Sequence, residues 1–300
     1  MMRAEPVVSR LKAEISERAV RIQKKIGRAP KLVALLIGND PVSRTYVALK
    51  RSDCNEVGIQ SEVLDLSNFG KEETPRIVLG KIKELNDDNT VDAIIPQMPF
   101  SGKISDEMVF SSLSPDKDVD GLTPFRLGKL LRGEYDLGKS LLPCTPKGIV
   151  LLLRHYGVKV EGADVGIVGR STLVGEPVRK LLQDLGATAT CYHTRTTNLL
   201  EKIAQSDIVV TAIGRPPEMY GQHGFRLVGN MVKTGSTVVS VGVRRDASTD
   251  KMLFDTETKS FKGICSFITP NTGGVGAMTR ATLLQNSLNA ANIRLGLNEY

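Results

Sequence analysis

The sequence predicts an α/β protein of two domains, in which mostly parallel sheets are covered by helices. The chain has 300 residues, more than a single globular domain usually contains. Helical and strand-like patterns alternate along both of its halves. A glycine-containing loop at 169–175 lies between an apolar strand pattern and a helical one, as in a dinucleotide-binding βαβ unit.

The first half of the chain begins with an amphipathic helix. Apolar residues recur every three or four positions from Val8 to Ile26, and Gly27 then ends the pattern. The compact apolar run Lys31–Ile37 is typical of a buried parallel strand. The next segments predict a three-layer α/β domain, with helices at 43–57 and 72–85 and strands at 61–66 and 91–95.

A second α/β series begins near residue 143, after a segment rich in Asp, Gly and Leu at 115–143 that we interpret as the domain junction. It predicts a Rossmann-type domain with strands at 164–168, 188–192, 207–213 and 236–241 and helices at 147–156, 175–185 and 197–205. The last helix, 279–291, is expected to return to the first domain. We therefore predict a first domain at 1–142, joined by 277–300, and a dinucleotide-binding domain at 143–276.

The composition narrows the class of protein. Hydrophobic residues make up 41% and charged residues 24%, as in ordinary globular proteins. No apolar run is long enough to span a membrane and the first residues lack a secretion signal, so we expect a cytoplasmic protein with no membrane partner. The net charge of +7 is not gathered into a basic cluster, which favours a small anionic ligand over nucleic acid.

The cysteines and histidines give no indication of a metal site. Their spacing matches neither a zinc site nor a redox pair. These residues are Cys54, Cys144, Cys191, Cys265, His155, His193 and His223.

The loop 169–175 has the features of a phosphate-binding turn. Glycine lets the backbone approach a pyrophosphate, and the start of the following helix offers free N–H groups. The spacing departs from the common G-x-G-x-x-G pattern. The loop alone therefore leaves open a simple tight turn between strand and helix.

The next strand favours NADP over NAD. It runs into His193-Thr194-Arg195-Thr196, with no carboxylate to bind the ribose hydroxyls of NAD. Hydroxyls together with Arg170 and Arg195 suit the 2′-phosphate of NADP, although a solvated loop with an incidental arginine is the alternative. The predicted cofactor-binding residues are Gly169, Arg170, Ser171, Gly175, Thr194, Arg195 and Val243.

In the first half, polar residues gather at positions where α/β folds bind ligands. Ser43, Tyr46 and Lys50 lie three and four residues apart, so they share one face of the predicted helix. Such a face is more often simply exposed. Gln97 follows a buried strand and Asp120 lies in a loop, however, and both are typical positions for ligand-binding side chains.

From about residue 30 to 285 the chain resembles the bifunctional methylenetetrahydrofolate dehydrogenase/methenyltetrahydrofolate cyclohydrolase family. The resemblance rests on Ser43-x-x-Tyr46-x-x-x-Lys50, Gln97 in Pro-Gln-Met-Pro, Lys117-Asp-Val-Asp-Gly121, Pro143-Cys-Thr-Pro146, Gly169-Arg-Ser171 and Gly273-Gly-Val-Gly276. It implies NADP-dependent oxidation of 5,10-methylenetetrahydrofolate and hydrolysis of the product to 10-formyltetrahydrofolate. It also implies a homodimer that serves one-carbon metabolism and purine biosynthesis.

The resemblance assigns roles to individual residues. Lys50 matches the catalytic lysine and Gln97 its partner, while Tyr46 matches the aromatic residue over the folate. Asp120 matches the carboxylate that holds the pterin, and the substrate-binding loop corresponds to Gly273 and Gly274. These roles are chemically reasonable, because a carboxylate can accept two N–H groups of a pterin edge and a lysine can move protons during hydrolysis.

The chain departs from the family pattern near the predicted cofactor and substrate sites. Thr272 and Ala277 stand where prolines are usual, Ser240 stands where an acid is common, and the segment 264–266 around Cys265 lacks an expected Asp. We expect these changes to affect cofactor preference and the balance of the two activities more than the class of enzyme.

Two alternatives remain open. The first is another two-domain NADP dehydrogenase resembling shikimate dehydrogenase, which gives no reason for Tyr46, Gln97 and the glycine loop together. The second is a dinucleotide-binding sensor without catalysis, which the presence of Lys50, Gln97 and Asp120 disfavours.

Overall fold

The computed structural model describes residues 1–38, 40–67, 69–70, 72–214, 225–246, 251–298 and 300, so His223 lies outside it. The chain divides into two compact units, one of Ser9–Cys144 with Arg280–Tyr300 and one of Met1–Val8 with Thr145–Thr279. Each unit contains a parallel sheet, as predicted. Within the described ranges, no helix has the length and apolar character needed to cross a bilayer.

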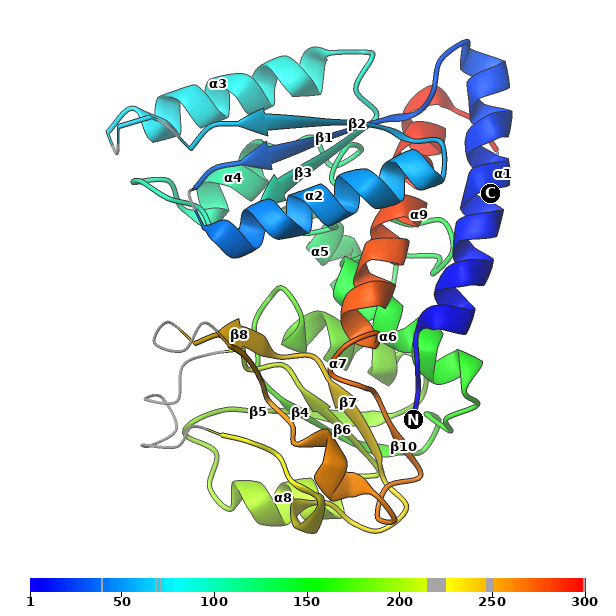
Figure 1. Ribbon diagram of the computed structural model, residues 1–300, viewed down its shortest axis with the longest axis vertical. Helices are drawn as coiled ribbons and strands as arrows, with labels where there is room; N and C mark the ends of the chain where they lie inside the picture. Colours follow the sequence, from blue (N-terminus) through cyan, green and yellow to red (C-terminus); the bar gives the residue numbers. More distant parts are fainter. Residues whose placement is uncertain (39, 68, 71, 215–224, 247–250, 299) are drawn as a thin grey trace. The chain divides into compact units, whose positions relative to one another are not determined.

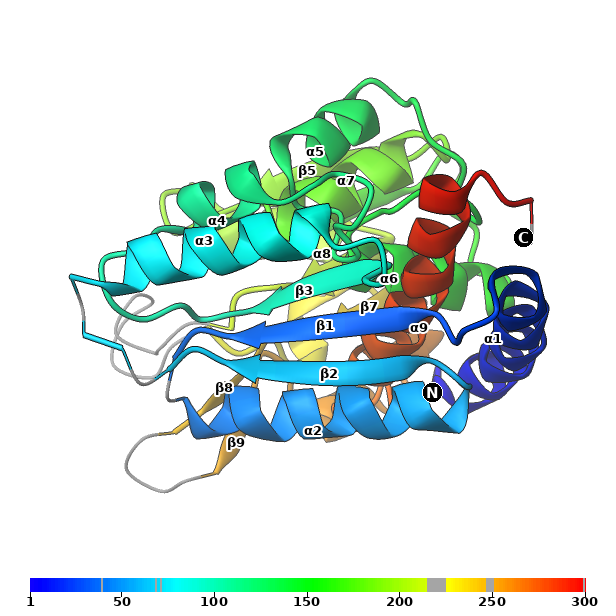
Figure 2. The same cartoon turned by 90° about the horizontal axis from the view of Figure 1, so that it is seen from above.

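The unit of Ser9–Cys144 has a three-stranded parallel sheet in the order β2 (Gln60–Asp65), β1 (Lys31–Leu36), β3 (Ala93–Gln97). Helix α2 (Pro41–Glu56) covers one face, and α3 (Thr74–Asp87) and α4 (Asp106–Ser112) cover the other (Figure 2). This arrangement confirms the predicted three layers. The core between the sheet and α3 contains Val33, Leu35, Ile37, Val78, Ile82, Leu85 and Ile94.

The segment interpreted as a domain junction, 115–143, belongs to the unit of Ser9–Cys144 and contains a helix that the sequence did not predict. It contains α5 (Pro124–Leu131), whose first turn is capped by the Thr123 hydroxyl accepting the Arg126 N–H at 3.3 Å. Eight residues are too few to show a helical repeat clearly in the sequence. Upstream of α5, Asp118 forms an isolated parallel bridge with Ile94, so this segment runs beside β3.

The unit of Thr145–Thr279 has a five-stranded parallel sheet, which confirms the Rossmann-type prediction (Figure 1). Its strand order is β10 (Phe267–Ile268), β7 (Thr237–Ser240), β6 (Ile208–Thr211), β4 (Asp164–Val168), β5 (Thr188–Tyr192). The remaining elements are α6 (Cys144–His155), α7 (Gly175–Gln183), α8 (Leu199–Gln205), the antiparallel pair β8 (Val243–Arg245) and β9 (Met252–Phe254), and the short 3₁₀ turns η1 (Gly229–Met231) and η2 (Thr258–Phe261).

The C-terminal helix α9 (Val275–Leu295) is longer than the predicted 279–291 and returns to the first unit as expected. The Asn286 amide donates to the Val119 and Leu142 carbonyls, each at 2.8 Å. Arg18, on α1 (Glu5–Ile26), donates to the Asn289 side chain at 2.7 Å. These hydrogen bonds join the two segments of this unit, Ser9–Cys144 and Arg280–Tyr300, which are separate in the sequence.

Residues Met1–Val8 differ from the predicted range 1–142, because they cluster with the dinucleotide-type unit. The backbone N–H of Met2 donates to the Ile268 carbonyl at 2.7 Å, and that of Ala4 donates to the Gly273 carbonyl at 2.9 Å. Both side chains are fully buried. Such pairing of backbone groups carries no side-chain pattern, so the sequence did not indicate it.

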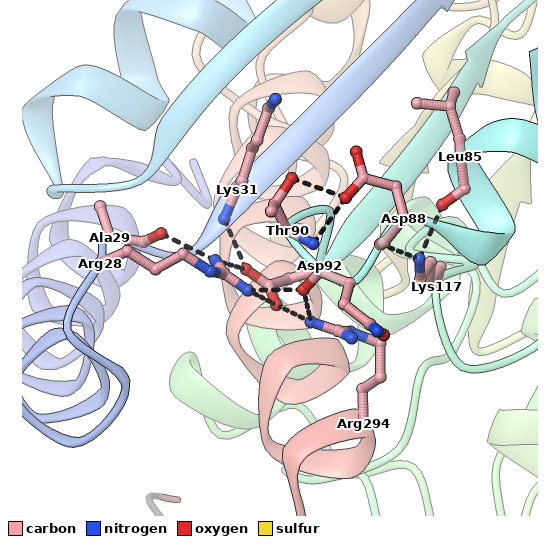
Figure 3. Close-up of polar contacts among 10 residues, drawn as sticks. Arg28, Ala29, Lys31, Leu85, Asp88, Thr90, Asp92, Lys117 and Arg294 are labelled. Carbon is pink, nitrogen blue, oxygen red and sulfur yellow. Dashed lines mark hydrogen bonds and ion pairs between the residues drawn. The ribbon is translucent and has the colours of Figure 1, made fainter.

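Asp92, just before β3, holds several elements of the first unit together (Figure 3). Its fully buried carboxylate accepts hydrogen bonds from Arg28 at 2.6 Å, from Arg294 of α9 at 2.6 Å and from the Lys31 N–H at 2.8 Å. Burial alone would raise the pKa of Asp92, but the bonds from Arg28 and Arg294 outweigh it and lower the pKa. The carboxylate is therefore stabilised in its charged form.

We predict that Asp92→Ala destabilises the protein by about 3 kcal/mol, because removing one partner of a buried ion pair leaves the arginines uncompensated. Urea unfolding followed by circular dichroism measures the loss. Glu72→Ala is the matched control, since its pair with Lys103 is exposed and worth at most about 1 kcal/mol. The difference between wild type and Asp92→Ala should narrow as the pH falls below about 4, where the carboxylate becomes protonated. An equal loss in both variants would contradict this role.

Candidate functional site

Lys50 and Gln97, which the sequence predicts as a catalytic pair, are in direct contact. The Lys50 ammonium donates to Gln97 Oε1 at 2.9 Å. Gln97 Nε2 donates to the Met98 carbonyl at 2.8 Å. The two bonds fix the orientation of the amide, because rotating it would put its NH₂ group against the ammonium. Gln97 is the last residue of β3 rather than the first after it, so Lys50 lies at the carboxyl end of the sheet.

The start of α2 is fixed to the same turn. The buried Ser43 hydroxyl lies 2.8 Å from Asp40 Oδ2 and 3.0 Å from the Met98 carbonyl. Asp40 also caps the helix by accepting the Ser43 N–H at 2.7 Å. Tyr46, half-buried, lies one turn before Lys50 on this helix. The predicted Ser43, Tyr46 and Lys50 face is therefore held in register with the end of β3.

Asp120 lies in a rigid turn beside β3. Ile94 N–H donates to the Lys117 carbonyl at 2.7 Å, and the Lys117 ammonium donates to the carbonyls of Leu85 and Asp88 at the end of α3, each at 2.7 Å (Figure 3). Burial lowers the pKa of Lys117 to about 8. Gly121 completes the turn with φ +65°, and a Cβ there would lie 2.6 Å from the Leu142 carbonyl carbon. The half-buried Asp120 therefore lies in a turn that is fixed before it by the bonds of Lys117 and after it by the close packing of Gly121.

Asp118 braces the same turn from inside. Its fully buried carboxylate accepts the Thr123 N–H at 2.7 Å. Burial, helped by the nearby charge of Asp120, raises the pKa of Asp118 to about 6, against the lowering effect of the bonds from Thr123. Asp118 therefore fixes the path of the chain around Asp120.

In the unit of Thr145–Thr279, a cavity of about 730 Å³ lies beyond the carboxyl ends of β4, β6 and β7. Ligands of open parallel sheets bind at this edge. The cavity is lined by Gly169, Arg170, Ser171, Leu173, Val174, His193, Thr194, Arg195, Ala212, Ile213, Gly214, Val241, Gly242 and Val243. Six of the seven predicted cofactor residues belong to this lining, and Gly175 starts the adjoining helix α7.

The loop at the start of α7 has room for backbone only. A Cβ at Gly175 would lie 2.3 Å from the Gly169 carbonyl oxygen. Gly169 has φ +128°, and a Cβ there would lie 2.4 Å from the Ala212 carbonyl oxygen. Glycines at these two positions let the loop 169–175 pack backbone to backbone against the end of β6 and the start of α7, so that no side chain stands between this loop and the cavity edge.

The loops after β4 and β5 each place an arginine at the cavity. Arg170 and Arg195 are both exposed at its lining, and the described residues of the lining include no Asp or Glu. His193 Nδ1 accepts the Arg195 N–H at 3.1 Å, and the His193 N–H donates to the Thr196 hydroxyl at 2.9 Å. These bonds order the loop that carries Thr194 and Arg195. The donor set fits the extra phosphate of NADP better than the ribose hydroxyls of NAD.

The glycine loop before α9 forms a tight turn. Gly273 has φ +74°, and a Cβ at Gly274 would lie 2.4 Å from the Pro270 carbonyl oxygen. Both glycines belong to the unit of Thr145–Thr279, whereas Tyr46, Lys50 and Asp120 belong to the unit of Ser9–Cys144. The direct contact among the predicted catalytic and substrate residues is the one between Lys50 and Gln97.

Both units match models of known protein domains. Residues 2–120 match the model of the catalytic domain of tetrahydrofolate dehydrogenase/cyclohydrolase, and residues 143–295 match the NAD(P)-binding domain of the same enzymes. The chain belongs to this family. Membership confirms the resemblance seen in the motifs and removes the alternative related to shikimate dehydrogenase.

Similar proteins cover nearly the whole chain. The bifunctional protein FolD of Pyrobaculum calidifontis is 43% identical over 282 residues, which are 93% of this chain and 91% of that protein. The crystal structure of the bifunctional FolD of Campylobacter jejuni has a TM-score of 0.87 at 34% identity and covers 98% of each chain. The Trypanosoma brucei FolD structure, complexed with NADP and an inhibitor, has a TM-score of 0.86 at 29% identity and covers 98% of this chain and 97% of that one.

Sequence reasoning missed part of the cavity wall. Ile213, Gly214 and Gly242 line the cavity directly after β6 and β7. Glycines placed just after two buried strands were the available signal, because such positions often allow close approach of a ligand. Among the residues that the structure describes, no group of three or more His, Cys, Asp or Glu side chains is placed to hold a metal ion.

We predict that Gly175→Ala weakens NADP binding at least tenfold, or by about 1.4 kcal/mol, because the new methyl group must displace the Gly169 carbonyl from the cradle. Isothermal titration calorimetry measures the dissociation constant. Gly80→Ala in α3 is the control, since its Cβ would meet nothing within 4 Å. Unchanged NADP affinity in a folded Gly175→Ala protein would show that the cradle does not bind the cofactor.

Proposed function

We propose that the protein oxidises 5,10-methylenetetrahydrofolate with NADP to the 5,10-methenyl form and hydrolyses this product to 10-formyltetrahydrofolate. Membership in the tetrahydrofolate dehydrogenase/cyclohydrolase family supports both reactions. The single observation that carries the proposal is the 2.9 Å bond between Lys50 and Gln97 at the carboxyl end of β3. It presents an oriented proton-transfer group in the unit that matches the catalytic domain.

In the oxidation, the chain's contribution is to position the substrate. When bound, NADP supplies the acceptor for the hydride that leaves the methylene carbon. The folate nitrogens stabilise the resulting iminium cation, so no protein acid or base is needed for this step. We assign Asp120 to the amino-pyrimidinone edge of the pterin, where a carboxylate accepts two N–H groups. Tyr46 supplies an aromatic surface for the substrate, and the loop of Gly273 and Gly274 approaches it through backbone.

In the hydrolysis, Lys50 moves protons. Water attacks the methenyl carbon and loses a proton, and the ring nitrogen that departs must gain one. A lysine can accept the first proton in its amine form and deliver the second in its ammonium form. Gln97 Oε1 accepts one of the three ammonium hydrogens, which leaves the others directed away from β3. Gln97 therefore aligns the lysine for both transfers.

We assign the cofactor preference to Arg170, Thr194 and Arg195. All three are exposed at the cavity lining, whose described residues carry no carboxylate that would repel a phosphate. An arginine binds a phosphate through two parallel N–H groups, which gives it a stronger contact than a neutral donor makes. The extra phosphate of NADP is the feature of the cofactor that these groups distinguish.

We also propose that the protein works in the cytoplasm as a homodimer, without nucleic-acid or membrane partners, in the one-carbon metabolism that supplies purine biosynthesis. The distributed net charge of +7 and the small-molecule cavity favour a small ligand over nucleic acid, and membership in the family supports the rest of this setting. Light scattering of the purified protein would give the mass of the assembly, and twice the 32.6 kDa chain mass is expected.

We predict that Arg170→Ala weakens NADPH binding by about tenfold to a hundredfold, the loss expected for a charge-assisted bond. Its affinity for NADH should change less than about twofold, since NADH lacks the phosphate. Fluorescence titration with each nucleotide measures the ratio. Arg154→Ala, on the exposed face of α6, is the control for a lost surface charge. Equal losses for NADPH and NADH would refute the assignment.

Lys50→Met should reduce cyclohydrolase activity at least about a hundredfold, the usual contribution of a positioned proton-transfer group. NADP affinity should stay unchanged, because the cofactor residues lie in the other unit. Hydrolysis of added methenyltetrahydrofolate, followed by its absorbance, measures the loss. Lys83→Met, at an exposed position of α3, is the control. Near-normal hydrolysis by Lys50→Met would reject the proposed role.

A further inference from the structure

Two consecutive residues after β9, Asp255 and Thr256, are buried, and their side chains bond to two different loops. The Asp255 carboxylate accepts the backbone N–H of Ile213 at 2.7 Å and that of Gly214 at 3.2 Å. Both of these residues line the cofactor cavity. Asp255 therefore holds the cavity wall that follows β6.

Asp255 also touches the neighbouring wall. A Cβ at Gly242 would lie 1.7 Å from an oxygen of the Asp255 carboxylate, so Gly242 lets the carboxylate pass directly under the loop after β7. Burial raises the pKa of Asp255, while the bonds from Ile213 and Gly214 and the charge of Arg244 act in the opposite direction. One carboxylate thus supports the cavity on two sides.

Thr256 bonds in another direction, to Ser240 and Asn271. Its hydroxyl lies 2.8 Å from Ser240 Oγ and 3.0 Å from Asn271 Oδ1, and Ser240 Oγ lies 3.1 Å from the same amide oxygen. One chain of donors satisfies these distances: the Thr256 hydroxyl donates to Ser240, and the Ser240 hydroxyl donates to Asn271. The Asn271 amide nitrogen in turn faces the Thr256 carbonyl at 3.4 Å.

Asn271 lies at the start of the glycine loop. It lies between Pro270, whose carbonyl is in close contact with Gly274, and the turn at Gly273. The loop is further tied to β7 by the Ser240 N–H, which donates to the Thr269 hydroxyl at 2.8 Å. Asn271 is thus joined to the two glycines by the short chain segment between them, and to Ser240 and Thr256 by hydrogen bonds.

We propose that Ser240, Thr256 and Asn271 are positioning residues for the folate substrate. Their hydrogen bonds tie the glycine loop to the segment Asp255-Thr256, and Asp255 of this segment holds the wall of the cofactor cavity. Displacement of this segment would move both loops. The proposal rests on the proposed function, which assigns Gly273 and Gly274 to the folate. It also gives Ser240 a role: in place of the acid expected there, a serine and an asparagine form a network of neutral groups, which does not titrate between pH 5 and 9.

Thr256→Val tests the proposal, because valine keeps the branched shape and replaces the hydroxyl with a methyl group that forms no hydrogen bond. We expect the KM for methylenetetrahydrofolate to rise about five- to tenfold at any pH from 6 to 8, the equivalent of one lost hydrogen bond. The NADP dissociation constant, measured by calorimetry without folate, should change less than about twofold. Thr256→Ser should restore wild-type behaviour. Asp255→Asn should show the opposite pattern: a higher dissociation constant for NADP and a folate KM that changes less than in Thr256→Val.

Thr258→Val is the matched control, because the Thr258 hydroxyl is buried nearby and forms no hydrogen bond with the described residues. Hydrogen exchange of the peptide 268–276 in the ligand-free protein gives a readout that does not depend on catalysis. We expect faster exchange in Thr256→Val and unchanged exchange in Thr256→Ser and Thr258→Val. A wild-type folate KM together with wild-type exchange in Thr256→Val would overturn the positioning role. A wild-type enzyme that forms no NADPH from methylenetetrahydrofolate would instead overturn the proposed function.

Discussion

The constraint on which the site depends is that parallel strands place their carboxyl ends at one edge of a sheet. In the unit of Ser9–Cys144, Leu36 pairs with both Asp65 and Gln97, so the three strands end together. In the unit of Thr145–Thr279, β4, β6 and β7 open onto the cavity in the same way. Each edge receives short loops whose backbone groups are not used by the sheet, and these loops carry the groups proposed for binding and chemistry.

Buried polar groups hold these loops in place, and each does so through backbone contacts. Asp118 and Lys117 brace the turn of Asp120, and Asp255 holds Ile213 and Gly214. A carboxylate that accepts two or three N–H groups in a site of low dielectric is costly to displace, so it keeps a loop rigid without touching the substrate. Reactions governed by positioning, such as hydride transfer, depend on rigidity of this kind.

The sequence was sufficient for features that repeat or that use glycine for close approach. The strand patterns, the cradle at Gly169 and Gly175 and the shared face of Ser43, Tyr46 and Lys50 were all predictable, because each depends on local spacing. The helix α5 and the pairing of Met2 with Ile268 were not, since one is too short for a repeat and the other uses only backbone. The roles of Asp255 and Asn271 depend on contacts between distant segments. Their residue types alone gave no signal.

This chain is expected to transfer a hydride from methylenetetrahydrofolate to NADP and then to add water to the methenyl product. Mass spectrometry of a single reaction tests both steps, if both hydrogens of the methylene carbon are replaced by deuterium and the solvent is ¹⁸O-labelled water. Direct hydride transfer followed by hydrolysis predicts deuterium in NADPH in equal amount to the folate oxidised, and one ¹⁸O atom in the formyl group of 10-formyltetrahydrofolate. Deuterium released to solvent would contradict the hydride transfer. Conversion of the methenyl product to ¹⁸O-labelled 10-formyltetrahydrofolate no faster than in the absence of enzyme would contradict the hydrolysis.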